Sequence, residues 1–341
     1  AGYALATHYA HRMAGSVPAS ARRIGGICEF VAEGLVGAEL GLSDPSCLAS
    51  YGAWEVSAGA FDAELLDELL GPGSPAYFAP APPVSVAGLW MGRVPVAFPV
   101  GDNQAGFHGL VADPLSACLV NLGTSGQLSF FSPEPKPAPG MELRPFLNRG
   151  YLQVGATLCG GKAWEILEEF LRSAAELVTS HRVESEAVYA AMEALASSEA
   201  EGGEALRVLP SFGGTRADPS RRGAILGIGL DNLRPGNMVR ALVAGVVEEL
   251  RGFSGGLGGD FGRMERIVAT GGFARRVAAV PRALAEGFGL SVGLSGAEDG
   301  SAIGAALIGA EAAGLIDAAA VSRIVSSLPL SLVGPRQRRG A

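Results

Sequence analysis

Two short glycine-containing segments carry the residue types most capable of chemistry. Asp102 follows the apolar run 94–100, so we predict a carboxylate in a glycine-flanked turn at the end of a buried strand. The run 118–122 leads into the turn 123–126, and 127–131 is predicted as the returning strand. A carboxylate can accept the proton of a hydroxyl, and the N–H groups of a glycine turn can bind a phosphate. The pair suggests phosphoryl transfer to an alcohol.

Each segment also has an ordinary structural interpretation. Asp102 could simply cap a turn with Asn103, and on this motif alone the two interpretations carry equal weight. Asn103 and Gln104 could hold ligand hydroxyls or only stabilise the turn. The sequence Gly-Thr-Ser-Gly, taken alone, favours a plain hairpin turn. The functional interpretation depends on Asp102 preceding it by one strand–helix–strand unit.

Two further glycine turns precede predicted helices. Gly271-Gly272 follows the predicted strand 267–269, and adjacent glycines there let a nucleotide approach the backbone and the helix N-terminus. Gly160-Gly161-Lys162 starts a long helix but is not a P-loop, because the upstream glycine and the following Ser or Thr are missing. A tight turn without a ligand is the alternative for both.

The order of predicted elements indicates an α/β protein. Glycines at the ends of predicted strands are typical of folds in which ligands bind near strand ends. The glycine-rich segment 255–259 could form a loop or a packed helix. The elements expected are helices at 3–13, 24–35, 61–70, 162–177, 184–198, 235–250 and from 302, and strands at 94–100, 117–122, 127–132, 150–157, 208–212, 267–269 and 290–292.

Composition limits the class of protein. The 341 residues suffice for two domains, and a chain with 48% hydrophobic and 18% charged residues is globular. The net charge of -8, without a basic stripe, argues against nucleic-acid binding. We find no signal peptide and no apolar stretch of about 18 residues, so we predict a cytoplasmic protein without a membrane span. The 4 cysteines form no C-x-x-C pair and are expected to be reduced, packed thiols.

The motifs in this order resemble the FGGY family of carbohydrate kinases. Within the family, residues 27–31 and 42–52 are most similar to sedoheptulokinases. The matching segments are Gly101–Ala105 (catalytic turn), Asn121–Ser125 (second phosphate loop), 213–227 (the G-x-R-x-P and D-P-x-A-R-G segment), Gly271–Arg276 (adenosine turn), and Glu298 with Gly304–Leu307 (closing acidic residue and helix).

The resemblance implies a fold and a set of site residues. The expected fold is the actin/hexokinase/Hsp70-like ATPase (ribonuclease H-like) fold, with a cleft between two domains. Residues 1–97 would be the remainder of an incomplete sugar-binding domain I, and 98–341 the nucleotide-binding domain II. Asp102 would be the general base and would also hold Mg²⁺ through a water. The sugar-binding residues would be Asp102, Asn103 and Asp44, and those at the ATP phosphates and adenosine Gly123, Thr124, Gly160, Gly161, Gly271, Gly272 and Arg276.

Two departures from the family pattern modify these expectations. Arg276 stands where the family usually has Asn near the adenosine. The family's N-terminal D-x-G-T/S loop is absent, and Ala1 lies in a predicted helix without a Met, so we expect the chain to lack its beginning and half of its phosphate clamp.

The resulting expectation is ATP- and Mg²⁺-dependent phosphorylation of a ketose or polyol, with sedoheptulose as a candidate. The alternatives are a weak or inactive sugar- or nucleotide-binding homologue, and a kinase for a pentulose, a sugar acid or glycerol. A homodimer is one option for the oligomeric state.

Overall fold

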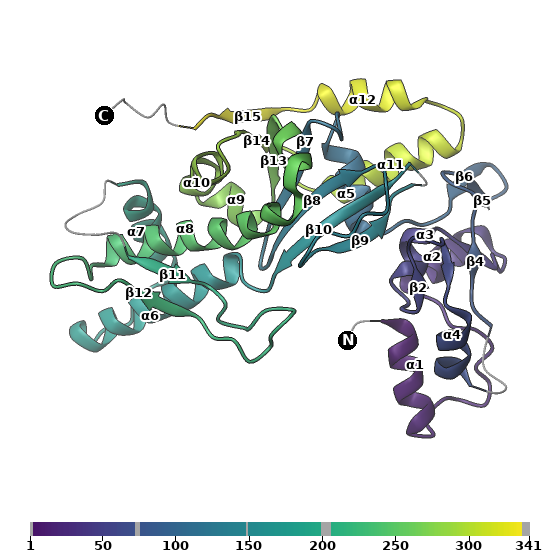
Figure 1. The fold of residues 1–341 in the computed structure, drawn as a ribbon, viewed down its shortest axis with the longest axis horizontal. Helices are drawn as coiled ribbons and strands as arrows, with labels where there is room; N and C mark the ends of the chain where they lie inside the picture. The colour runs from purple at the N-terminus through teal and green to yellow at the C-terminus, as the bar shows by residue number, and fades with distance from the viewer. Residues whose placement is uncertain (1–2, 72–75, 148, 199–205, 336–341) are drawn as a thin grey trace.

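The computed structural model describes residues 3–71, 76–147, 149–198 and 206–335, which form a larger α/β unit and a smaller, mainly helical unit (Figure 1). The larger unit is built on a seven-stranded mixed sheet in the order β15-β14-β13-β7-β8-β10-β9. Its strands are β7 (Ala117–Leu122), β8 (Gly126–Ser132), β9 (Glu142–Pro145), β10 (Tyr151–Thr157), β13 (Arg266–Thr270), β14 (Ser291–Ser295) and β15 (Leu330–Val333).

Strand direction brings two of the predicted glycine turns to one edge of the sheet. β7 and β13 are parallel neighbours, with Thr270 in register with Asn121. Because parallel neighbours end at the same edge, the turn after Leu122 and the turn after Thr270 lie side by side. β7 returns directly into antiparallel β8, as the sequence predicts.

Helices cover both faces of the sheet, and the strands alternate accordingly (Figure 1). On β7, Cys118 and Val120 pack into one hydrophobic cluster, while Leu119 packs into a second one on the other face. This period-two burial is expected for a strand covered on both sides. The first face carries α6 (Gly161–Thr179), α7 (Ser185–Ser197), α8 (Pro235–Ser254) and α10 (Ala279–Phe288); the second carries α5 (Asp102–Leu110) and α11 (Gly300–Ala312), with α12 (Ala318–Ser326) beside α11.

The smaller unit lies beside the β9 edge of the sheet, and its α3 contacts β9 (Figure 1). It has its own hydrophobic cluster, which includes Leu5, Tyr51 and Phe78. The domain boundary at 97/98 stays a prediction. The elements of this unit are α1 (Ala4–Met13), α2 (Ile27–Val36), α3 (Pro45–Ala49), α4 (Ala63–Leu70), and the strand pairs β1–β4 (Leu42–Ser43, Ala79–Pro80), β2–β3 (Trp54–Glu55, Ala60–Phe61) and β5–β6 (Val86–Trp90, Val94–Ala97).

Most of the long predicted elements are confirmed. The helix predicted over 24–35 is α2, and Gly37 ends it in the left-handed conformation with φ 74°. The segment 255–259 belongs to a 3₁₀ helix, η1 (Gly255–Arg263). The remaining elements are β11 (Arg207–Leu209), β12 (Ala224–Leu226) and α9 (Gly272–Arg276). The predicted loop 199–204 and the predicted tail after Pro335 lie outside the described residues.

Three sequence expectations are wrong. The run 94–100 is not a buried strand: β6 pairs only with β5, and Val94 is 43% exposed, because the hairpin lies outside the main sheet. Asp102 does not sit in a turn but is the first residue of α5. Cys28 is exposed rather than packed, and hydrogen bonding with Cys47 lowers its pKa to about 7.

Candidate active site

The backbone around Asp102 is fixed from both units of the structure. The Gly101 N–H donates to Ser46 Oγ of α3 (2.9 Å), and Ser301 Oγ of α11 donates to the Asp102 carbonyl oxygen (2.9 Å). The Asp102 carboxylate accepts the Asn103 N–H at 2.7 Å. An aspartate in the first turn of a helix is favourable because the helix dipole is positive there. Asp102 is thus held at the start of α5, and one of its carboxylate oxygens accepts no hydrogen bond from the residues that the structure describes.

Three cavities follow one another through the site, and Asp102 lines two of them. The first cavity (about 650 Å³) and the central cavity (about 150 Å³) share Asp102, and the distal cavity (about 590 Å³) adjoins the central one where Gly271 is followed by Gly272. The first cavity includes Ser46, Trp54, Asp102, Gln104, Glu142 and Arg144; the central one Asp102, Asn103, Asn121, Gly271, Glu298 and Asp299; the distal one Gly123, Thr124, Gly161, Phe273 and Arg276.

The predicted phosphate loop is bound to the start of α6. Gly161 N–H donates to the Gly123 carbonyl oxygen at 2.7 Å, and Gly160 N–H donates to that of Thr124 at 2.9 Å. A Cβ at Gly160 would lie 2.7 Å from the Ser125 carbonyl oxygen, so only glycine permits this close approach. A Cβ at Gly123 would meet nothing within 4 Å. Gly160 therefore serves the packing of the loop, whereas Gly123 borders open space in the distal cavity.

This difference gives a prediction for Gly123. Gly123→Val should leave thermal stability unchanged, because the side chain enters open space. It should weaken ATP binding by about tenfold, which corresponds to about 1.4 kcal/mol, by narrowing the distal cavity. Isothermal calorimetry with ATP checks the affinity. Gly34→Val is the matched control, because a Cβ at Gly34 also meets nothing within 4 Å and α2 is remote from the distal cavity. Equal ATP affinity of the two variants would contradict the role given to Gly123.

The turn after β13 is shaped by backbone contact. Gly271 has φ 98°, and a Cβ there would lie 2.4 Å from the Leu122 carbonyl oxygen. Arg276 folds back over this turn, since a Cβ at Gly272 would lie 3.1 Å from its Nη2. The rings of Trp164 and Phe273 form part of the distal cavity wall, with centroids 5.7 Å apart. The distal cavity therefore combines apolar rings and glycine backbone with the guanidinium of Arg276 and the carboxylates of Glu165, Glu186 and Glu193.

The central cavity has a donor set that fits Mg²⁺ bound together with a nucleotide. Asp102, Glu298 and Asp299 line it, and the Asp299 carboxylate also accepts the Ala302 N–H (2.9 Å) as the cap of α11. Within the described ranges, no group of three or more His, Cys, Asp or Glu forms a complete metal site. Mg²⁺ commonly uses one or two carboxylates together with waters and substrate phosphates. These residues therefore suit a metal ion that arrives with the phosphates.

Asp44 lies behind the wall of the first cavity. Its carboxylate caps α3 by accepting hydrogen bonds from the Ser46 N–H (2.8 Å) and from the Ser46 hydroxyl (2.6 Å). Burial raises the pKa of Asp44. It is Ser46 that reaches the cavity wall, so the contact of Asp44 with a sugar stays a prediction.

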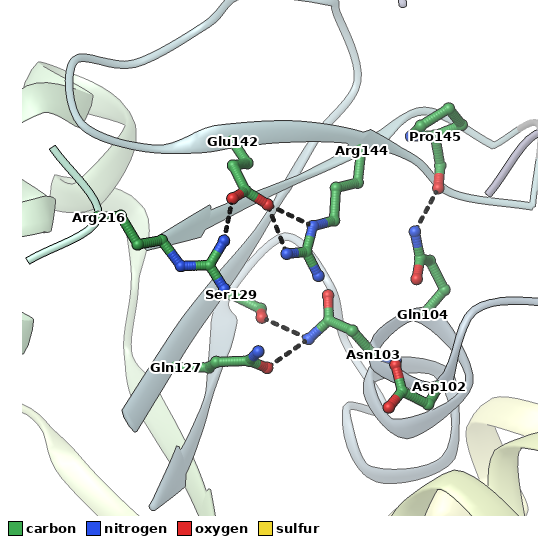
Figure 2. A network of polar contacts seen from close by, with 9 residues as sticks. All are labelled: Asp102, Asn103, Gln104, Gln127, Ser129, Glu142, Arg144, Pro145 and Arg216. Carbon is green, nitrogen blue, oxygen red and sulfur yellow. Dashed lines mark hydrogen bonds and ion pairs between the residues drawn. The ribbon is translucent and has the colours of Figure 1, made fainter. Parts of the chain in front are cut away.

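Neighbouring side chains hold the first turn of α5 against the sheet. Asn103 Nδ2 donates to Gln127 Oε1 (3.3 Å) and Ser129 Oγ (3.1 Å), and Gln104 Nε2 donates to the Pro145 carbonyl oxygen (3.1 Å), as Figure 2 shows. Both amides therefore stabilise the first turn of α5, which is one of the two roles that the sequence allows for them. Asn103 also lines the central cavity beside Asp102.

Sequence reasoning assigned no site role to Asp299 of the central cavity or to three charged residues beside the first cavity. Glu142 and Arg144 line the first cavity from β9, and Arg216 reaches Glu142 from the loop between β11 and β12. Partial burial raises the pKa of Glu142, but the hydrogen bonds and charges of Arg144 and Arg216 outweigh it and hold that pKa below its ordinary value. The available signal was the opposite charge two residues apart, which places both side chains on one face of a strand.

The sequence profile of the FGGY family of carbohydrate kinases, C-terminal domain, matches residues 118–313, so the chain belongs to this family. It is 27% identical over 303 residues to the sedoheptulokinase of Homo sapiens, covering 83% of this chain and 61% of that protein. It is 28% identical over 245 residues to the sedoheptulokinase of Mus musculus, covering 66% and 49%. The chain thus spans between about half and three-fifths of these curated relatives.

Solved structures confirm the predicted fold. The xylulose kinase from Lactobacillus acidophilus superposes with a TM-score of 0.81 at 21% identity, covering 98% of this chain and 68% of that one. The glycerol kinase of Plasmodium falciparum with ADP gives 0.72 at 14% identity, covering 92% and 62%. At these identities the likeness shows the actin-like ATPase fold. A separate finding is that no described helix is long and apolar enough to cross a membrane.

Proposed function

We propose that this protein is an ATP-dependent sugar kinase that phosphorylates a hydroxyl of a neutral ketose or polyol. The observation that carries the proposal is the position of Asp102, between the first cavity and the central cavity. A sugar in the first cavity and phosphates in the central cavity would meet at this carboxylate. Sedoheptulose is the first candidate substrate, because the two curated relatives are sedoheptulokinases.

In the proposed mechanism, the chain supplies the general base, orients the two substrates and binds the phosphates. An oxygen of the Asp102 carboxylate accepts the proton of the sugar hydroxyl as that hydroxyl attacks the γ-phosphorus. The bond between the γ-phosphorus and the β,γ-bridging oxygen breaks, and ADP leaves. Gly123 and Thr124 of the distal cavity would bind the phosphates that extend from there toward the central cavity, and the glycines Gly161, Gly271 and Gly272 would let the nucleotide approach the backbone. Mg²⁺, held near Asp102 through water, would neutralise phosphate charge. Most of the rate enhancement would come from positioning and charge stabilisation.

A second candidate function is nucleotide or sugar binding with weak or no transfer. Arg276 favours it, because its guanidinium lies over the turn at Gly272 in the distal cavity, where the family pattern has a shorter Asn. Cytoplasmic location and a homodimer stay predictions.

A turnover panel separates these candidates. The native full-length protein with MgATP should release ADP when sedoheptulose, xylulose or glycerol is added, and only slowly without a sugar. A coupled ADP assay with each neutral compound and with gluconate measures the rates. Tight ligand binding without sugar-dependent ADP release would overturn the kinase proposal in favour of the binding homologue.

A further inference from the structure

A three-residue ion-pair cluster forms one wall of the first cavity. Glu142 and Arg144 are two residues apart on β9, so their side chains leave the same face of the strand. Arg144 Nε and Nη2 donate to Glu142 Oε2 at 3.1 and 2.5 Å, and Arg216 Nη1 donates to Glu142 Oε1. Figure 2 shows this chain of contacts running from Arg216 through Glu142 to Arg144. Glu142 thus holds two guanidinium groups with its two oxygens.

Arg144 keeps donors free on the side of the site. Its Nη1 makes no hydrogen bond within the ranges that the structure describes, and its side chain is 23% exposed. Figure 2 shows the guanidinium extending from β9 toward the start of α5, where Asn103 and Asp102 lie. A guanidinium donates hydrogen bonds and accepts none, so a group that binds this edge must be an acceptor. Asn103 Oδ1, which is buried and has no hydrogen-bond partner among the described residues, makes no such bond with Arg144.

The charges that line the first cavity indicate whether the acceptor for Arg144 is a charged or an uncharged oxygen. The charged residues lining the first cavity are the carboxylates of Asp102 and Glu142 and the guanidinium of Arg144. This lining carries two negative charges and one positive charge, and Arg216, which shares Glu142 with Arg144, lies outside it and is half exposed. A carboxylate or phosphate on the substrate would therefore meet a net negative wall that includes Asp102. A hydroxyl or carbonyl oxygen accepts a hydrogen bond from Arg144 without that repulsion.

We propose that Arg144 is a substrate-binding, specificity-determining residue that donates to an uncharged oxygen of a neutral ketose or polyol. Glu142 sets the orientation of Arg144 and opposes its positive charge. Arg216 acts as a positioning residue, because it fixes Glu142 from the loop between β11 and β12. The inference rests on the proposed function and adds the basis on which this cavity rejects sugar acids.

Binding and kinetic measurements on three variants test this role. Arg144→Gln should bind sedoheptulose and xylulose about tenfold more weakly, with unchanged ATP affinity, and should raise KM more than it lowers kcat. Arg216→Gln should shift KM in the same direction by a smaller factor. Glu142→Gln leaves Arg144 without its counter-charge, so gluconate should bind about tenfold more tightly than to the unmodified protein. Isothermal titration calorimetry measures the affinity for each compound without any phosphoryl transfer.

Two further variants, Arg207→Gln and Arg144→Lys, serve as controls. Arg207→Gln breaks the exposed pair of Arg207 with Glu248 (3.0 Å), outside all three cavities, and should leave sugar binding unchanged. Arg144→Lys keeps the charge but loses the planar fork, and its sugar affinity should fall between those of the unmodified protein and Arg144→Gln. Unchanged sugar affinity in Arg144→Gln, or unchanged gluconate affinity in Glu142→Gln, would overturn this inference alone. Failure of the unmodified protein to bind any of the sugars would overturn the proposed function as well.

Discussion

Asp102→Asn should reduce the rate of phosphoryl transfer by a factor of about 10²–10⁴ and leave ATP affinity nearly unchanged. The amide has almost the same shape as the carboxylate and can still accept the Asn103 N–H, so the start of α5 should keep its geometry. It cannot, however, take the proton of a substrate hydroxyl. Single-turnover kinetics with saturating sugar measures the transfer step, and calorimetry measures ATP binding.

The matched control for this variant is Asp317→Asn. Asp317 caps α12 by accepting the Ala320 N–H at 2.7 Å, and Asn caps a helix about as well as Asp. It lies outside the three cavities, so its transfer rate should equal that of the unmodified protein. Equal rates for Asp102→Asn and Asp317→Asn would remove Asp102 from the mechanism.

Gly304→Ala should lower the free energy of unfolding by about 2–3 kcal/mol and reduce activity at the same time. α11 packs against α5 so closely that a Cβ at Gly304 would lie 1.7 Å from the Ala105 carbonyl oxygen. Neither backbone can yield locally, so the two helices must move apart. Because α5 begins at Asp102, this movement displaces the carboxylate.

Urea unfolding and the turnover assay together check the Gly304 prediction. Gly309→Ala on the same helix is the control, since a Cβ at Gly309 meets nothing within 4 Å. This control should gain up to about 1 kcal/mol from better helix propensity and keep full activity. A stable, fully active Gly304→Ala protein would show that the close helix contact does not position Asp102.

The parts of the site that the sequence predicted are those fixed locally. The turns at Gly123 and Gly271 each follow a strand rich in β-branched and aliphatic residues, and Gly271 has a positive φ of 98° that favours glycine. Parallel pairing of β7 with β13 then brings them together. Local patterns therefore predicted both the elements and the nucleotide side of the site.

The parts that the sequence did not predict depend on distant contacts. The sequence predicts Asp102 in a turn, but the Gly101–Ser46 and Asp102–Ser301 contacts, which join residues 55 and 199 positions apart, hold it at the start of a helix. The run 94–100 is apolar enough for a buried strand, yet the hairpin it joins lies apart from the main sheet. The Glu142–Arg216 pair joins segments 74 residues apart, and no local pattern marks such a partner.

In the proposed mechanism, Asp102 takes the proton of the sugar hydroxyl during phosphoryl transfer. The most direct measurement is ³¹P NMR of the native full-length protein with MgATP and a neutral ketose, compared with its Asp102→Asn variant. We expect a sugar phosphomonoester signal to grow with the unmodified protein only when the sugar is present, and to be nearly absent with Asp102→Asn. A phosphomonoester formed by Asp102→Asn at a rate near that of the unmodified protein would contradict the claim.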